Sequence, residues 1–267
     1  MSRALLRHTW RSNRVRLLVV CTAALLWGGL LPVIYSRFGS SFKGLFESGA
    51  LPQAATSFGG GDIFSLSGVL ALGFIHPIAI SLVCVFAVGF ATSAVAGERQ
   101  RGTLEILLSR PLSRRRVYAT LLCAALGFVA LVLTTLLCGA LVSASVFGVI
   151  GELELGRVPL AWLNAFLVFG AFTTIALAAS VSCDRPSRAL GATLAFVLVS
   201  YVLEILGSLW PDAAFLQRYS LFHYMETRSV LTGNADPFTF SLLAVVALAA
   251  IGLALVIFPR RDLAAPT

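Results

Sequence analysis

The chain has 267 residues, of which 58% are hydrophobic and only 12% are charged, and its mean hydropathy is +0.91. A soluble domain usually carries roughly 25% charged residues, so this composition excludes a soluble domain for most of the chain. The net charge of +8 would fit a nucleic-acid partner, unless the basic residues lie beside membrane segments.

The N-terminal stretch, residues 1–16, is basic and places Leu5, Leu6 and Trp10 among arginines. This pattern predicts a short amphipathic helix at the cytoplasmic surface. A basic stretch before an apolar run is also typical of a signal peptide. The run that follows is longer than the apolar core of a signal peptide, and no clear small-x-small cleavage site comes after it. We therefore expect a retained first membrane helix.

Six apolar segments are long enough to cross a bilayer, which takes about 20 residues of helix. Runs this long and continuous favour helices over barrel strands, which alternate over about ten residues. We predict an all-α polytopic membrane protein, with residues 1–267 forming a single transmembrane domain. Its six transmembrane helices are expected at Leu17–Tyr35, Gly68–Gly97, Val117–Phe147, Leu160–Ser182, Ala189–Leu209 and Phe238–Phe258.

The basic residues predict the orientation of these helices. If the N-terminus is cytoplasmic, fifteen of the twenty lysines and arginines fall on the cytoplasmic side. Membrane proteins carry such an excess in their cytoplasmic loops, so both termini are expected in the cytoplasm. The arginines would then contact the headgroups of membrane lipids, and no nucleic-acid partner is needed. The preference for arginine over lysine fits a GC-rich bacterial genome, and the cell inner (plasma) membrane is the expected location.

Two polar residues lie within the apolar segments. His76 precedes Pro77 early in the second segment, where a proline kinks a helix or marks its true start. Glu204 lies in the fifth segment, where a charge costs roughly 3 kcal/mol on insertion scales and should face protein or a wet cavity. Both residues are candidates for a translocation path. The alternative is a buried interhelical hydrogen bond for Glu204 and an interface position for His76.

The outer loop at 210–237 contains Phe215, Tyr219, Phe222 and Met225 at spacings of four and three. This spacing predicts a short amphipathic helix with one apolar face. Such a helix would lie at headgroup level, where aromatic residues gather. It could also act as an outer gate over an exit path.

Motifs for catalysis are absent from the sequence. The single lysine, Lys43, is not part of a Gly-Lys-Ser/Thr phosphate loop. There is no His-Glu-x-x-His zinc motif and no Gly-x-Ser-x-Gly elbow. The five cysteines include no Cys-x-x-Cys pair. We therefore expect no catalytic residue, metal or cofactor in this chain.

The loop at 98–116 is an arginine-rich island between the second and third segments. Glu98, Arg101 and Glu105 share one helical face, and Arg101 and Glu105 are spaced to form an ion pair. A neighbouring apolar face is formed by Leu104, Leu107 and Leu108. An apolar face in the cytosol needs a partner surface or the membrane itself.

The end of this loop has two further signals. Pro111 disfavours helix at the residue before it and should turn the chain. Ser113 would then cap the N-terminus of the third membrane helix.

The pattern Glu98-x-x-x-Gly102-Thr103-Leu104-Glu105-x-Leu107-Leu108-Ser109-x-Pro111-Leu112-Ser113-Arg114 resembles the first cytoplasmic loop of ABC transporter permeases of the type-2 exporter class. The six-helix layout and the basic N-terminus are similar too. The resemblance implies half of a translocation path, completed by a second permease chain, identical or homologous. It also implies two cytosolic ABC ATPase subunits, which would bind the ATP and Mg. The ATPase-coupling residues it implies are Glu98, Arg101, Gly102, Thr103, Leu104, Glu105, Leu108 and Pro111.

Two other functions remain open. The chain could be a membrane scaffold or assembly factor that binds a partner through the same loop without transporting anything. It could also be a secondary transporter that uses Glu204 as a proton relay and needs no ATPase.

Overall fold

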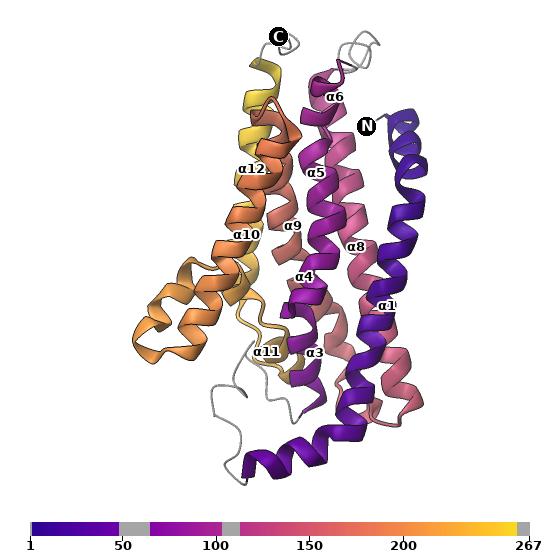
Figure 1. The fold of residues 1–267 in the computed structure, drawn as a ribbon, viewed down its shortest axis with the longest axis vertical. Helices are drawn as coiled ribbons and strands as arrows, with labels where there is room; N and C mark the ends of the chain where they lie inside the picture. Colours follow the sequence, from indigo (N-terminus) through magenta and orange to yellow (C-terminus); the bar gives the residue numbers. More distant parts are fainter. Residues whose placement is uncertain (1, 48–64, 103–112, 261–267) are drawn as a thin grey trace.

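The structure, a computed structural model, describes residues 2–47, 65–102 and 113–260, and for residues 39–47 it describes the backbone alone. Within these ranges the chain forms helices and no strands (Figure 1). Five helices are long and apolar enough to cross a membrane, and a bent pair of helices can supply a sixth span. The five are α1 (Arg3–Glu47), α8 (Arg114–Val146), α9 (Val158–Ser182), α10 (Pro186–Leu209) and α12 (Pro237–Arg260). The prediction of an all-helical, multi-pass membrane fold is confirmed.

The first helix is longer than predicted. α1 runs for 45 residues without interruption, although Pro32 lies inside it. The basic stretch at residues 3–16 forms its first turns, with no break before the apolar run. The first span was predicted to end at Tyr35, but the helix continues up to Glu47. At about 1.5 Å per residue, such a helix is longer than the bilayer is thick.

The second span, predicted over Gly68–Gly97 with a kink or a true start at Pro77, is divided into short pieces. The pieces are α3 (Leu66–Ile75), α4 (Pro77–Val83), a π-helical turn η2 (Cys84–Val88), α5 (Gly89–Ser93) and α6 (Ala96–Gln100). The axis bends by 49° between Leu66–Ile75 and Pro77–Ser93. Pro77 occupies the first turn of α4, where its missing N–H costs no hydrogen bond. The prediction that Pro77 marks a kink or a new start is confirmed.

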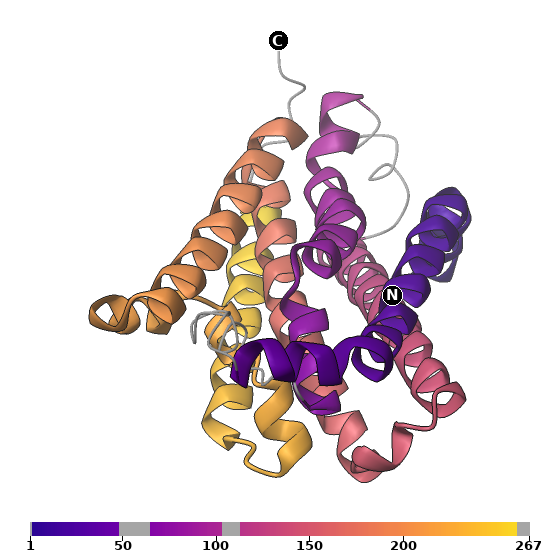
Figure 2. The same ribbon diagram turned by 60° about the horizontal axis from the view of Figure 1, so that its bottom comes forward.

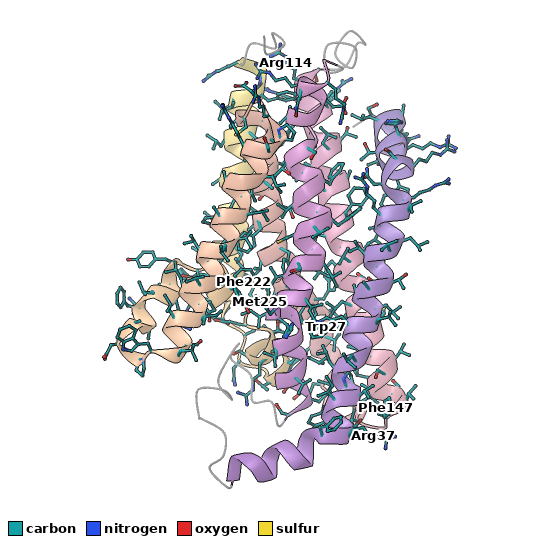
Figure 3. The ribbon with its side chains drawn as sticks, in the orientation of Figure 1. Trp27, Arg37, Arg114, Phe147, Phe222 and Met225 are labelled. Carbon is teal, nitrogen blue, oxygen red and sulfur yellow. The ribbon has the colours of Figure 1, made fainter. Side chains whose placement is uncertain are left out.

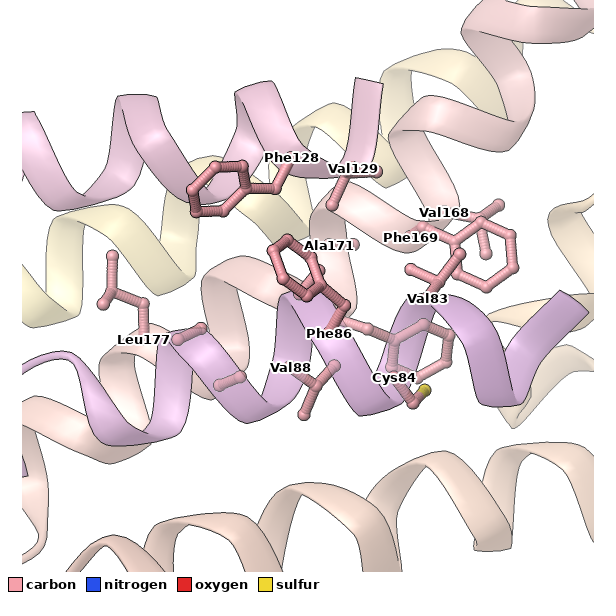
Figure 4. Close-up of a cluster of buried hydrophobic side chains, with 14 of the residues drawn as sticks. Val83, Cys84, Phe86, Val88, Phe128, Val129, Val168, Phe169, Ala171 and Leu177 are labelled. Carbon is pink, nitrogen blue, oxygen red and sulfur yellow. The ribbon is translucent and has the colours of Figure 1, made fainter. Parts of the chain in front are cut away.

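The core is formed where the broken span meets α8 and α9 (Figure 4). Phe128 of α8 is fully buried. Its ring makes edge-to-face contacts with Phe86, at a centroid distance of 5.0 Å, and with Phe90, at 5.1 Å. Such pairs contribute about 0.5–1.5 kcal/mol beyond the area that they bury. The view in Figure 2 shows α1 lying along α8, and α9 contacts both α10 and α12.

The close approach of α1 and α8 depends on two glycines, Gly28 and Gly139. A Cβ added to Gly28 would overlap the carbonyl of Leu136, and one added to Gly139 would overlap the carbonyl of Leu25. The position of Gly29 is less crowded, because a Cβ added there would lie 3.6 Å from the carbonyl oxygen of Gly139. Small residues at such positions allow membrane helices to approach backbone to backbone.

The connection after α10 differs from the single amphipathic helix expected at 210–237. It contains two 3-10 segments, η5 (Pro211–Tyr219) and η6 (Phe222–Tyr224), and a short helix α11 (Thr227–Thr232). Phe215 and Tyr219 are 59% and 72% exposed, whereas Phe222 and Met225 are buried. Figure 3 shows Phe222 and Met225 in the interior of the bundle. The expectation of one shared apolar face is wrong, because the chain leaves the helical path at Ser220 and folds inward.

Candidate functional site

The residues of the predicted coupling loop lie at one end of the bundle, which we call the α6 end. Figure 1 shows that this end also holds the start of α1, the start of α8 and the end of α12. The turn between α9 and α10, residues 183–185, lies there too. Five of the predicted coupling residues lie outside the described residues: Thr103, Leu104, Glu105, Leu108 and Pro111.

The described coupling residues form the last turn of α6. Arg101 pairs with Glu98 on the preceding turn. The pairing of Arg101 with Glu105 is not described, because Glu105 lies outside the described residues. Gly102 adopts a positive φ of 69°, and its N–H donates to the carbonyl of Arg99 at 3.0 Å. A left-handed glycine is a common way to end a helix, since it has no Cβ to clash.

The entry to the loop is anchored to α9 and to the turn that follows it. The helix is interrupted between α5 and α6, and the N–H groups of Val95 and Ala96 both donate to Ser180 Oγ of α9 at 3.1 Å. Ser180 is fully buried. One turn further on, Arg99 Nη1 forms an ion pair with Asp184 Oδ1 at 2.9 Å. The side chain of Arg99 is only 12% exposed, so water screens this pair less than it screens a surface pair.

The exit from the loop is anchored to α12. Ser113 caps α8 by accepting a hydrogen bond from the N–H of Arg116 at 3.3 Å, which confirms the predicted cap. Arg114 Nη1 donates to the carbonyls of Phe258 and Pro259 at 3.2 and 3.1 Å; Figure 3 shows Arg114 at this end of the molecule. The last carbonyls of a helix lack partners within it, and a cation there also complements the helix dipole.

Sequence reasoning did not identify the anchors Ser180 and Asp184. Ser180 is a small residue in an apolar helix, and its hydrogen bonds depend on an interruption of another helix that periodicity does not reveal. Asp184 carried a weak signal, because it is an acidic residue in a short turn expected to face a cytoplasm rich in arginine.

A second polar site surrounds Glu204, at the end of the bundle opposite α6. Glu204 is only 7% exposed, although it lies in an apolar helix. Gln217 of η5 donates through Nε2 to Glu204 Oε1 at 3.0 Å. The Nδ1 atom of His223 lies 3.9 Å from Glu204 Oε2, which is too long for a hydrogen bond. The buried hydrogen bond considered from the sequence is therefore present, with Gln217 as its partner.

The imidazole of His223 lies outside the spanning helices. Its side chain is 40% exposed. Partial burial lowers the pKa of His223, while nearby Glu226 raises it and Arg218 lowers it.

His76 has a local structural role at the break between α3 and α4. Its Nδ1 accepts a hydrogen bond from the N–H of Ile78 at 3.3 Å and so caps α4. Its ring lies 4.6 Å from the ring of Trp27 on α1, measured between centroids. Trp27 Nε1 in turn donates to the carbonyl of Gly73 at 3.0 Å. These contacts hold the break against α1.

A crevice of ≈ 690 Å³ opens between the first turns of α1 and the α5–α6 region. The polar side of α1 lines it with Thr9, Ser12 and Asn13, and Glu98 and Arg101 line it from α6. The structure therefore places a crevice with polar lining beside Glu98 and Arg101, two of the predicted coupling residues.

A comparison with protein families finds that a model described as ABC-2 family transporter protein matches residues 6–263. A comparison with curated proteins finds no match. The family match covers the spanning helices and both anchored ends of the loop. Membership of this family makes the chain a membrane transport component that associates with an ABC ATPase. The protein belongs to the ABC-2 family of transporter proteins.

Proposed function

We propose that this protein is the permease subunit of an ATP-driven ABC exporter in the cell inner membrane. It would form half of a translocation path with a second permease chain, identical or homologous, and both of its termini would be cytoplasmic. Two separate ATPase subunits would bind ATP and Mg and act on the loop between α6 and α8. The observation that carries this proposal is the attachment of this loop to different helices at its two ends.

Movement of the loop would be transmitted along two routes. At its entry, the Arg99–Asp184 ion pair and the Ser180 hydrogen bonds connect α6 to α9 and to the start of α10. At its exit, Arg114 connects α8 to the last turn of α12. Short polar contacts of this kind resist separation better than apolar contacts that can slide. A force on the loop would therefore tilt α9, α10 and α12 together, as rigid-body transport mechanisms require.

The polar crevice beside α6 supports an inward-facing part of the path. The crevice lies between α1 and the broken span, so its shape would change when α6 moves. The breaks at His76 and at Ala94–Val95 divide this span into pieces that can move separately. α1 is continuous and would serve as the fixed wall of the crevice.

The test uses the tagged full-length chain in lipid nanodiscs with the ABC ATPase that copurifies with it. ATP hydrolysis is measured for the wild type, for Glu105→Arg and for Asp184→Asn. Glu105→Arg is expected to weaken ATPase binding, because it reverses a charge on the proposed docking face. Asp184→Asn should leave the complex intact but lower the stimulated hydrolysis, because α6 is then released from the α9–α10 turn.

The matched control is Asp212→Asn, a second aspartate, at the opposite end of the bundle. The exchanged pair Arg99→Asp with Asp184→Arg should restore part of the lost hydrolysis if the ion pair transmits force. If the complex is stable and none of these substitutions changes its rate of ATP hydrolysis, the result would favour the scaffold hypothesis. Failure to recover any ATPase, together with transport driven by a proton gradient, would favour a secondary transporter.

A further inference from the structure

The cavity beside Glu204 is separate from the anchors of the coupling loop. It has a volume of ≈ 290 Å³ and is lined by parts of α10, η5, η6, α11 and the end of α3. Arg228 and Ser229 of α11 also line a neighbouring hollow of ≈ 370 Å³. The two spaces therefore share part of their lining.

One carboxylate oxygen in this cavity has no hydrogen-bond partner. Glu204 Oε1 accepts from Gln217, but Glu204 Oε2 is buried and accepts from no described group. The Nδ1 atom of His223 is 3.9 Å away from Glu204 Oε2. A buried carboxyl oxygen without a hydrogen-bond partner is costly. The site is therefore complete only when a donor occupies the space next to Glu204 Oε2.

The lining indicates which donor fits. Glu226 is a second carboxylate in the wall, and its Oε1 atom already accepts from Thr239 at 3.2 Å. The lining contains two carboxyl groups and one guanidinium, that of Arg228, so it carries a net negative charge when both carboxyl groups are ionised and His223 is neutral. A cation would be attracted to this wall, and an anion would be repelled.

The remaining lining distinguishes an organic cation from a metal ion. Ile75, Phe222 and Met225 form an apolar wall, and all three are buried. In the part of the chain that the structure describes, no three His, Cys, Asp or Glu side chains are placed to hold a metal ion. An apolar wall with one unsatisfied carboxylate oxygen is the arrangement expected for an amine with a hydrocarbon body.

We propose that this cavity binds an organic ammonium ion, with the ammonium group donating to Glu204 Oε2 and the hydrocarbon part packing against Phe222 and Met225. The site is built by this chain alone and does not depend on coupling to an ATPase. It would be reached from the end of the bundle opposite α6.

The test measures binding to the purified full-length chain in phosphatidylcholine nanodiscs without any ATPase. The probe is benzylamine, and benzyl alcohol is the uncharged control of nearly the same shape. Saturation-transfer NMR gives the affinity, and empty nanodiscs correct for partition into lipid. Benzylamine should bind saturably and at least about tenfold more tightly than benzyl alcohol, the value of one charge-assisted hydrogen bond.

Two variants assign the site. Glu204→Gln retains an acceptor for Gln217 but removes the charge, and should abolish the preference for benzylamine. Glu154→Gln is the matched control, since Glu154 is 63% exposed and pairs with Arg157, and it should leave the preference unchanged. Ser229→Phe fills the cavity without altering a charge and should block both probes, which keeps the test valid if Glu204→Gln folds poorly.

Three results would overturn the proposal. Equal binding of the two probes would show an apolar void, and an undiminished preference in Glu204→Gln would place the amine elsewhere. Absence of saturable benzylamine binding would mean that no amine site exists. Because no ATPase is present, none of these results bears on the proposed function, which would fail only in the hydrolysis experiment.

Discussion

The contact between α1 and α8 allows a matched pair of substitutions on adjacent glycines. Gly28 is buried against the backbone of α8, whereas Gly29 beside it is only partly buried. A Cβ on Gly28 would lie well inside 3.0 Å of the Leu136 carbonyl, closer than real Cβ atoms approach. A Cβ on Gly29 would lie 3.6 Å from its nearest neighbour, which is ordinary van der Waals contact. Gly28→Ala and Gly29→Ala each add one methyl group to α1, and they differ in the space available for that methyl group.

The expected magnitude follows from this difference. Either alanine improves helix propensity by about 1 kcal/mol, and this gain cancels in the comparison. Gly28→Ala must also move α1 away from α8 by roughly 1 Å, and overpacking of this kind costs about 1–3 kcal/mol. A gap of 0.5–1 Å removes about a quarter to a half of the dispersion energy of the contacts that it separates. Gly28→Ala should therefore be less stable than Gly29→Ala by about 1–3 kcal/mol, mainly through loss of α1–α8 packing.

The assay is thermal unfolding in nanodiscs followed by tryptophan fluorescence. For domains of 150–250 residues, 1 kcal/mol shifts the midpoint by about 2–4 °C. Gly139→Ala and Gly127→Ala repeat the comparison on α8, because a Cβ on Gly139 would overlap a carbonyl and one on Gly127 would have open space. Equal midpoints within each pair would refute the reasoning, since the helices would then separate at no cost.

Two further predictions concern polar groups. Ser180→Ala should destabilise the protein by about 1–3 kcal/mol for each of the two backbone N–H groups left without an acceptor. Ser182→Ala is the control, because the Ser182 hydroxyl donates to the carbonyl of Ala178 on its own helix. Similar midpoints of thermal unfolding for the two variants would contradict the bridging role of Ser180. The lowered pKa of His223 means that the unfolded chain takes up a proton near pH 6.5 while the folded chain does not. Its contribution to stability is complete above pH 6.5 and is lost as the pH falls below it. On acidification, the thermal unfolding midpoint of the wild type should therefore fall slightly more than that of His223→Gln. A larger fall in the variant would contradict a lowered pKa of His223 in the folded protein.

The sequence predicted the spanning helices well because one strong signal defines them. A helix in lipid must be apolar for about 20 residues, and composition alone reveals such runs. Each end of α9 and of α12 therefore lies within two residues of its predicted position. The Ser113 cap and the break at Pro77 were also predictable, since each depends on the local chemistry of one residue.

The interruption between α5 and α6 was not predictable in the same way. It occurs in an apolar, small-residue stretch with no proline, and it persists because Ser180 satisfies the freed N–H groups from another helix. The prediction for the chain after α10 was wrong for a similar reason. The spacing of Phe215, Tyr219, Phe222 and Met225 fits a helix, but the last two are buried. The ring of Phe222 packs against Phe172 of α9 and Tyr201 of α10, which the spacing does not reveal. Tertiary contacts of this kind override local periodicity.

The same limit applies to the candidate sites. Glu204 stood out because a carboxylate in an apolar segment needs an explanation. Its partner Gln217 did not, because a glutamine in an exposed polar loop is unremarkable until η5 folds back onto α10. His76 drew attention for the same reason as Glu204, yet its contacts are with its own helix and with Trp27.

The π-helical turn at Cys84–Val88 sets the phase of everything that follows it in the second span. A π turn accommodates one residue more than an α turn, and one residue corresponds to a rotation of about 100°. If this turn adopted α geometry with all of its residues retained, α5 and α6 would rotate by about that angle relative to α9. Arg99 would then face away from Asp184, although no residue of either anchor had changed. The alignment of the charged residues therefore depends on the π geometry of this apolar turn as well as on their identity.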